Sequence, residues 1–531
     1  GGPIRKDKTF FFAAYEGLIR RESAFTTILA DRSILQPTDR QQDLIDTLVG
    51  SGSPSFVAQG QQLRALLTTA PDSPFQANRN TYKLLDGSTG AFPLIENSST
   101  GSIRLDHGLS EQDFLFLRYS LTNNSQHNFG VGGLFAPSAG FDVGIRDSTF
   151  VVGETHLFGN GLSNEFRFQS IRNVASVAPV DPFGPRYQVA GIGNFGREFQ
   201  SPTKATQRRV QFLDNLSLTR GRHNFKFGGD FSHYTIDSLA AIFLGGAVDF
   251  AQLPIPLGQV LGDVAAAQLA TNISRLGRPD LASVITTERL TTVQQINFGF
   301  ARAINQGFGN PNTGFTGQVL GLYVQDGLKV KPNLSLSFGL RYDYDLQPPG
   351  TPRDSNNFGP RFSFAYDPFK NARTVIRGGG GIYYQALLSG ITIVSSVLET
   401  GMISSLLVSP DPLLTPISPT SPCGQALATT GLPPSFCFYR QLVARGLLTT
   451  PSSRTIPESA YSDLLGLMRE TSANRVLVRL ARDLVNPYAI QGNLGIDHQL
   501  GRDWNLSINY LINRGVNLAR LRQVNALPNP N

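Results

Sequence analysis

The sequence predicts an all-β protein, an antiparallel β-barrel that crosses a membrane with its strands. The first observation is the segment Leu334–Leu346, in which apolar and polar residues alternate without interruption. Such alternation is typical of a strand with one apolar face, which contacts a protein core or lipid, and one polar face, which contacts water. The second observation is that many such segments are joined alternately by short turns and long connections. The third is that no apolar run is long enough for a membrane-spanning helix, whereas barrel strands need only about nine to eleven residues.

The alternation also predicts the face on which each side chain lies, because successive residues of a strand point in opposite directions. Apolar residues are expected outside a membrane barrel and polar residues inside it. The predicted lipid-facing residues are Leu336, Phe338, Leu340, Leu506 and Ile508. The predicted lumen-facing polar residues are Ser337, Arg341, Asp343, Asp345, Ser507 and Asn509.

About thirteen strands are predicted from β-type alternation and flanking turn residues. In chain order they are Lys8–Arg20, Gly101–Gly108, Gln112–Asn123, Thr149–Phe158, Asn164–Asn173, Val210–Thr219, Asn224–Ile236, Val319–Val330, Leu334–Leu346, Arg361–Asp367, Arg373–Tyr384, Tyr488–Leu500 and Trp504–Ile512. Within each predicted hairpin of this series, the two strands are joined by a turn of the length that hairpins prefer.

Connections on the other side of the predicted sheet are long, above all residues 237–318 and 385–487. Short turns at one end and long loops at the other are typical of a bacterial outer-membrane barrel, whose long loops lie outside the cell. Three helices are predicted within these insertions. They are Gln41–Val49, with its start at Thr38-Asp39, then Gln61–Thr68 and Pro457–Glu470.

Composition favours the same class. The chain has 54 Gly, 36 Phe and 15 Tyr but only 2 Met and 2 Cys, which suits an outer-membrane barrel. Its net charge of +7 arises from 46 basic and 39 acidic residues that are dispersed, so we expect no nucleic-acid partner. The alternative at this point is a large soluble all-β protein.

Residues that carry chemistry are few. The six histidines, which are His107, His127, His156, His223, His233 and His498, show no spacing of a zinc site. The glycine run Gly378–Gly381 lacks a following Lys-Ser or Lys-Thr, so we interpret it as a strand kink or close backbone packing. No nucleophile elbow is present. We therefore expect no enzyme activity, no metal, no catalytic residues and no cofactor.

The two cysteines, Cys423 and Cys437, both lie in the longest connection. A loop at the cell surface is in an oxidising environment, which favours a disulfide between them. The alternative is a pair of free thiols.

Several motifs together resemble a known family. The segment Gly321–Asp343 resembles the central barrel hairpin of TonB-dependent outer-membrane receptors, through its Gln-Asp pair, Asn-Leu turn and Arg-Tyr-Asp end. Residues Gly1–Gly17, which read GGPIRKDKTFFFAAYEG, resemble the segment that follows the plug domain in the Oar-like branch of these receptors. The stretches Asp214–Gly229, Pro360–Tyr384 and Tyr488–Arg514 are similar to that branch as well.

The resemblance implies a barrel of about 22 strands around a plugged lumen, of which about thirteen lie here. Residues 1–531 are then an incomplete TonB-dependent receptor-like β-barrel domain, a fragment that lacks the signal peptide, the plug and the C-terminal strands.

The implied function is energised uptake or surface binding of an unidentified bulky substrate in the bacterial outer membrane. The implied partners are outer-membrane lipid and, through the missing N-terminal plug, the TonB complex. A second reading is a cell-surface adhesion or interaction protein that uses the barrel as a platform. A third is a soluble carbohydrate-binding β-sandwich protein.

Overall fold

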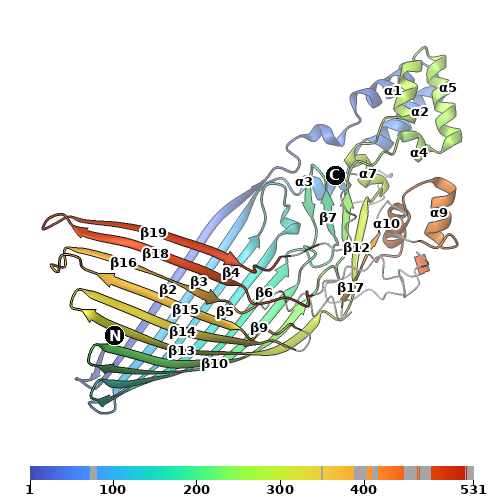
Figure 1. The fold of residues 1–531 in the computed structure, drawn as a ribbon. Helices are drawn as coiled ribbons and strands as arrows, with labels where there is room; N and C mark the ends of the chain where they lie inside the picture. The colour runs from blue at the N-terminus through green and yellow to red at the C-terminus, as the bar shows by residue number, and fades with distance from the viewer. Residues whose placement is uncertain are drawn as a thin grey trace.

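The computed structural model describes residues 1–71, 81–348, 351–387, 403–408, 417–447 and 480–520, together with 391, 463–464, 466 and 522. Within these residues, 14 strands form one large sheet in which every neighbouring pair is antiparallel. The sheet curves so that its later strands lie in front of its earlier ones in Figure 1. It is an open sheet, with β1 and β19 as its two edges.

The strands of the large sheet are β1 (Gly2–Arg5), β2 (Thr9–Thr26), β3 (Gly90–Gly108), β4 (Asp113–Phe129), β5 (Phe141–Gly159), β6 (Leu162–Pro179), β9 (Thr203–Arg220), β10 (His223–Ala240), β13 (Asn312–Lys331), β14 (Leu334–Leu346), β15 (Asn357–Tyr366), β16 (Thr374–Tyr384), β18 (Tyr488–Gln499) and β19 (Asn505–Val516). All thirteen predicted strands are present, and the bounds of β14 match the prediction at both ends. The short edge strand β1 was not predicted.

Several strands are longer than predicted, mainly toward the long connections. Strand β3 begins at Gly90 rather than Gly101, and it pairs with β2 along its whole length. Residues 96–100 of β3 are polar on both faces, so the alternation disappears although the ladder continues. The alternation of apolar and polar residues therefore marks only the part of each strand that has an apolar face, whereas the backbone hydrogen bonds extend beyond that part.

The predicted asymmetry of the two ends is confirmed. Short turns join the hairpins at one end of the sheet, as at residues 160–161 and 221–222. Long connections leave the other end, and they run together into the assembly that lies at the upper right of Figure 1. The connection predicted at 237–318 spans residues 241–311, because β10 and β13 pair beyond the predicted strand ends. The connection 385–487 has the predicted bounds.

The long connections build a folded assembly that we call the cap. It contains a second sheet of five strands in the order β17-β12-β11-β7-β8. Their bounds are β7 (Arg186–Val189), β8 (Gly193–Phe195), β11 (Ala247–Phe250), β12 (Ala303–Gly309) and β17 (Ile403–Val408). The buried core around this sheet takes side chains from five different connections, including Leu35, Ala136, Phe195, Phe250 and Phe438. The cap therefore has a hydrophobic core of its own.

The helices of the described chain lie in the cap. They are α1 (Asp39–Val49), α2 (Pro54–Leu67), α3 (Thr81–Asp86), α4 (Leu257–Leu261), α5 (Asp263–Arg275), α6 (Ala282–Thr286), α7 (Thr292–Phe298), α9 (Pro422–Thr430) and α10 (Pro434–Ala444), with single turns η1 (Arg32–Leu35), η2 (Pro137–Ala139) and η3 (Pro279–Leu281). The predicted helix at 41–49 is confirmed. The one predicted at 61–68 begins earlier, at Pro54. The one predicted at 457–470 falls almost entirely outside the described residues.

None of the helices in the described ranges is long and apolar enough to cross a membrane.

Helices α1, α2, α4, α5 and α6 pack into a lobe with a second hydrophobic core, which joins the connection after β2 to the connection after β10. A pair of buried amides joins the same two connections at helix starts. Gln41 Nε2 donates to Gln294 Oε1 at 3.2 Å, and Gln294 Nε2 donates to Gln41 Oε1 at 2.7 Å. Each glutamine also closes a capping box, with Thr38 and Thr291 as N-caps. The lobe is therefore held at a fixed position in the cap.

Candidate functional site

The two predicted sets of residues lie on opposite faces of the large sheet. On β14, Phe338 and Leu340 share a face with Phe362 of β15, and the rings of Phe338 and Phe362 have centroids 5.2 Å apart. Phe338 is 48% exposed and Leu340 is 43% exposed, which is unusual for large apolar side chains in a strand. We call this side of the sheet the apolar face and the other side the polar face. That the apolar face contacts lipid stays a prediction.

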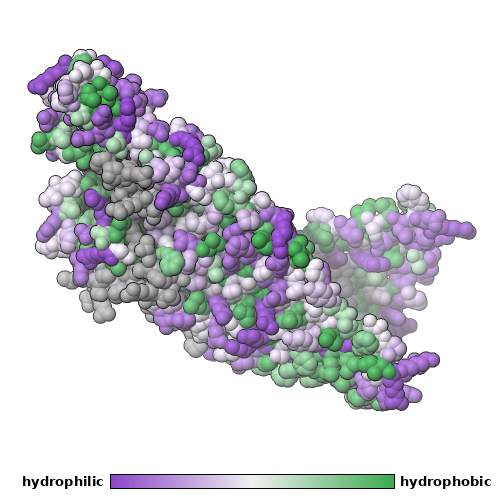
Figure 2. Space-filling model, turned by 180° about the vertical axis from the view of Figure 1, so that it is seen from behind, coloured by the Kyte–Doolittle hydropathy of each residue, from purple (hydrophilic) through white to green (hydrophobic). Residues whose placement is uncertain are grey.

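The same division holds on β19. Leu506 and Ile508 are large exposed apolar residues, 45% and 58% accessible, whereas Ser507 and Asn509 point the other way along the ladder with β18. Ser507 donates its hydroxyl to Asp497 on the polar face. Figure 2 shows apolar side chains gathered in the lower part of the sheet, toward the short turns, and hydrophilic ones interspersed above them.

An ion-pair network occupies the polar face. Arg341 Nη2 contacts Asp230 Oδ1 at 2.7 Å, and Arg341 Nε contacts Asp343 Oδ1 at 2.8 Å. Asp230 belongs to β10 and Arg341 to β14, so the guanidinium lies over the intervening strand β13. Gly321 of β13 makes this possible, because a Cβ there would lie 2.0 Å from Arg341 Nη2. Two carboxylates thus hold one arginine in place on the sheet.

A second bridge of the same kind crosses β10. The Tyr323 hydroxyl of β13 donates to Asn215 Oδ1 of β9 at 2.7 Å. Gly228 lies beneath it, and a Cβ at this position would lie 2.5 Å from the tyrosine ring. Glycines in these strands therefore allow side chains from neighbouring strands to lie close over the backbone, a role expected for a glycine in a strand.

Next to these bridges, the sheet is hollowed by about 470 Å³. Polar and aromatic residues line the hollow from five strands, with Lys226, Gln325, Ser337, Arg361 and Tyr383 among them. The Arg361 guanidinium lies 4.6 Å from the centre of the Tyr383 ring. The arrangement presents hydrogen-bond donors and cations over an open surface. It can bind polar or anionic groups. Among the described residues that line it, no nucleophilic side chain lies beside a general base.

Asp345 has a different role from a solvated lumen residue. It is 5% exposed, accepts hydrogen bonds from Gln347 Nε2 at 2.7 Å and from the Leu387 backbone amide at 3.1 Å, and so ties the end of β14 to the connection that begins after β16. The periodicity placed Asp345 on the polar face, but no sequence signal identified its partners.

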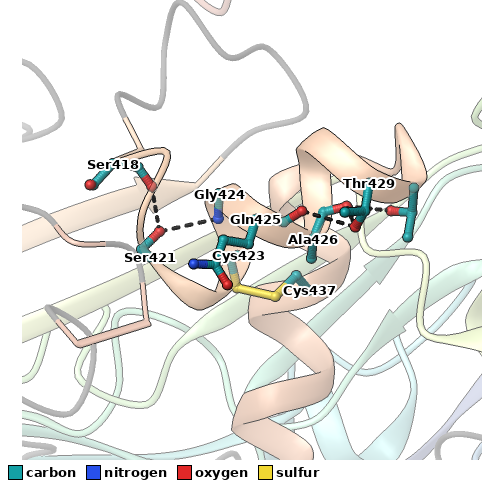
Figure 3. Close-up of a disulfide and its surroundings, with 9 residues drawn as sticks. Ser418, Ser421, Cys423, Gly424, Gln425, Ala426, Thr429 and Cys437 are labelled. Atoms are coloured by element: carbon teal, nitrogen blue, oxygen red, sulfur yellow. Dashed lines mark hydrogen bonds between the residues drawn. A yellow bond between two sulfur atoms is a disulfide. The ribbon is translucent and has the colours of Figure 1, made fainter.

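The structure joins Cys423 and Cys437 by a disulfide between α9 and α10 (Figure 3). Their Cα atoms lie 5.5 Å apart, and Cys423 is fully buried in the cap core. Ser421 caps α9: its hydroxyl accepts from the Gly424 amide at 3.1 Å and donates to the Ser418 carbonyl at 2.7 Å. The bridge therefore closes a compact pair of helices against the five-stranded sheet.

Burial shifts the pKa of two charged groups in the cap. Burial lowers the pKa of the Arg197 guanidinium, and the nearby Asp181 carboxylate opposes that shift. Burial raises the pKa of the Asp249 carboxyl in β11, against the opposite effect of Arg302 and Arg186. Desolvation is thus the larger influence at both groups.

One group among the described residues brings three metal-ligand atoms together. Asp113, Glu154 and His156 lie on the apolar face near the short turns, with their ligand atoms within 4.8 Å of one another. His156 Nδ1 is already hydrogen-bonded to Asp113. Spacing along the sequence does not reveal this group, because its members come from two different strands, β4 and β5. Partly exposed carboxylates of this kind also occur without an ion, so the group by itself assigns no metal site.

The family model described as "Outer membrane beta barrel domain" matches residues 1–351 and 345–531 of the chain. No curated protein matches it.

Solved structures that align with the chain include the outer membrane transporter YddB from Escherichia coli, at 11% identity and a TM-score of 0.47, covering 80% of this chain and 41% of that one. A mutant of the ferric enterobactin receptor PfeA from Pseudomonas aeruginosa aligns at 11% identity and a TM-score of 0.42, covering 81% and 44%. The siderophore receptor PirA from Acinetobacter baumannii aligns at 11% and 0.42, covering 79% and 43%. The chain spans less than half the length of each.

Proposed function

Because the chain belongs to the outer membrane β-barrel domain family, we propose that it forms the wall and cap of a TonB-dependent receptor of the Oar-like kind. The protein is located in the bacterial outer membrane. In this proposal it binds a bulky substrate at the cell surface and takes it up with energy from the TonB complex. Like the family it resembles, it is a transporter without enzyme activity.

The observation that carries the proposal is the folded cap over one end of the sheet. Its core draws side chains from five connections, and a disulfide closes one of them. Loops that merely join strands do not need a shared core, whereas a rigid binding surface does. The hollow with Lys226 and Arg361 on the polar face supplies hydrogen-bonding groups along the route from the cap to the short turns.

An adhesion or interaction protein that uses the barrel as a platform is the second candidate. The helical lobe of the cap favours it, because its helices α1, α2 and α5 extend farthest from the large sheet in Figure 1. The soluble β-sandwich does not fit, since a sandwich packs two sheets face to face. Here the large sheet leaves Phe338 and Ile508 exposed on its apolar face.

Interaction with TonB distinguishes the two candidates. The full-length protein, extracted from outer membranes, is mixed with the purified periplasmic domain of TonB, and co-purification is measured. Transport predicts a complex that is lost when the segment preceding residue 1 of this chain is deleted. A full-length protein that shows no binding to TonB would favour the platform and contradict energised uptake.

The long connections are expected outside the cell. Protease added to intact cells that carry the full-length protein should cut within residues 241–311 or 385–487, since these leave the end opposite the short turns. The turn at 221–222 should stay intact until the outer membrane is opened, and it serves as the internal control. Cleavage of the connections only after opening would reverse the orientation.

A further inference from the structure

Four cations gather on the apolar face of three neighbouring strands, close to the long connections. They are Arg146 of β5, Arg172 of β6, and Lys204 and Arg208 of β9, and all four are exposed. We call them the basic cluster. Arg172 stands directly opposite Arg208 in the ladder. Arg146 precedes Ser148, the residue opposite Arg172, by two positions, so the two arginines are diagonal neighbours on one face.

The basic cluster lies at the border of the greasy surface. Phe168 and Phe212 share its face, four residues nearer the short turns, and their rings are 5.2 Å apart. Four residues of a strand span about 13 Å, so Arg172 and Arg208 lie about that far from the aromatic pair, on the side of the long connections. In outer-membrane barrels, aromatic residues border the apolar band, so cations just beyond them are expected at the level of the headgroups.

The cations of the basic cluster exceed the carboxylates beside them. Arg208 contacts Asp237 Oδ2 at 2.6 Å. Asp142, on the same face, contacts His127 instead. Within the part of the chain that the structure describes, no carboxylate forms an ion pair with Arg146 or Arg172. Like charges directly opposite each other in a sheet are unfavourable, so the pair Arg172 and Arg208 is one that an external anion would stabilise.

A hollow of about 590 Å³ adjoins the basic cluster. It is lined by Lys204 and Asp237, with Asn312 and Gly314 from β13. Its walls offer a cation and an amide beside the exposed guanidinium groups, which suits a group that carries both phosphate and hydroxyls. At the same end of the sheet, the later strands present aromatic pairs instead, as in Tyr342 with Phe358 and Tyr384 with Tyr488. The cationic character is thus local.

We propose that the basic cluster is a binding site for the phosphate groups of a phosphorylated lipid in the outer leaflet of the membrane. One guanidinium group can donate two parallel hydrogen bonds to the oxygens of a phosphate. Cations near a membrane surface also attract anionic headgroups. The acyl chains of such a lipid would lie along Phe168 and Phe212, and its polar part would enter the hollow beside Lys204. The site is on the outside of the wall and is independent of substrate uptake, although it rests on the long connections lying outside the cell.

The test uses full-length protein in phosphatidylcholine nanodiscs that contain diphosphoryl lipid A or its monophosphoryl form. Bound lipid A is measured by native mass spectrometry. Wild-type protein should retain the diphosphoryl form, and the double variant Arg146→Gln with Arg172→Gln should bind it about tenfold more weakly. Arg21→Gln is the matched control, because Arg21 is an exposed arginine of β2 on the same face, hydrogen-bonded to Asn97 and outside the cluster.

The result that overturns the site is equal retention by wild type and double variant, or an equal loss in Arg21→Gln. Heat-modifiable migration of each variant shows that it has folded. A measurement on wild type alone gives an independent check: added salt should weaken binding of the diphosphoryl form more than the monophosphoryl form. Release of the lipid by inorganic phosphate, at an ionic strength at which sodium chloride leaves the lipid bound, would assign the cluster to free phosphate and contradict a lipid site.

Discussion

Replacement of Phe338 by arginine is expected to destabilise the membrane-inserted protein by about 2–4 kcal/mol if the site lies near the bilayer midplane. Phe338 projects from the middle of β14 on the apolar face, where it packs against Phe362 of β15. An arginine there would have to reach water past apolar neighbours such as Leu340. The change is measured on the full-length protein by urea-dependent unfolding from lipid vesicles.

The neighbouring substitution Ser337→Arg is the matched control. Ser337 is on the polar face, beside the hollow that Lys226 and Arg361 already line with charge. It should therefore cost less than about 1 kcal/mol, the range of a surface substitution. Equal destabilisation by both variants would show that the two faces do not differ in environment.

Loss of the bridge between Cys423 and Cys437 is expected to destabilise the cap by about 3 kcal/mol, the value for closing a loop of about fifteen residues. The sequence separation of 14 lies in this range. The double variant Cys423→Ser with Cys437→Ser should expose the α9 and α10 segment to protease at a lower temperature. The large sheet should keep its heat-modifiable migration, because the bridge touches only the cap core.

Reduction of wild-type protein should reproduce the effect of the double variant and should leave that variant unchanged. A cap that resists protease equally with and without the bridge would mean that the core around Phe438 and Tyr439 is sufficient by itself.

The strands of the large sheet could be predicted because one face of each is greasy. Strand β14 alternates along its whole length, so its bounds and both of its faces follow from the residues alone. The upper part of β3 does not alternate, and only its ladder with β2 and β4 shows that the strand continues there. A polar strand segment carries no periodic signal, although its backbone pairs as well as any other.

The cap could not be predicted in the same way. Strand β11 has four residues, and its sequence Ala-Val-Asp-Phe resembles many loops. Its partners β7 and β12 come from positions about sixty residues away on either side. Short strands that meet only through distant connections leave no local pattern, so the sequence predicts only a long connection over residues 237–318.

The candidate site was predicted in part. The alternation placed Arg341 and Asp343 on one face, and the structure joins them. It gave no indication of Asp230, which lies 111 residues away and reaches Arg341 only across Gly321. The basic cluster was missed for the same reason, because Arg146, Arg172 and Arg208 come together only through strand pairing.

The most direct test of the membrane barrel is the environment of two adjacent side chains. Nitroxide labels are placed on the full-length protein in lipid vesicles through Phe338→Cys and Ser337→Cys, and relaxation by oxygen is compared with relaxation by a water-soluble nickel chelate. We predict that the label at 338 responds mainly to oxygen and the label at 337 mainly to the chelate. Equal access of both reagents at the two positions would contradict the assignment of the apolar face to lipid.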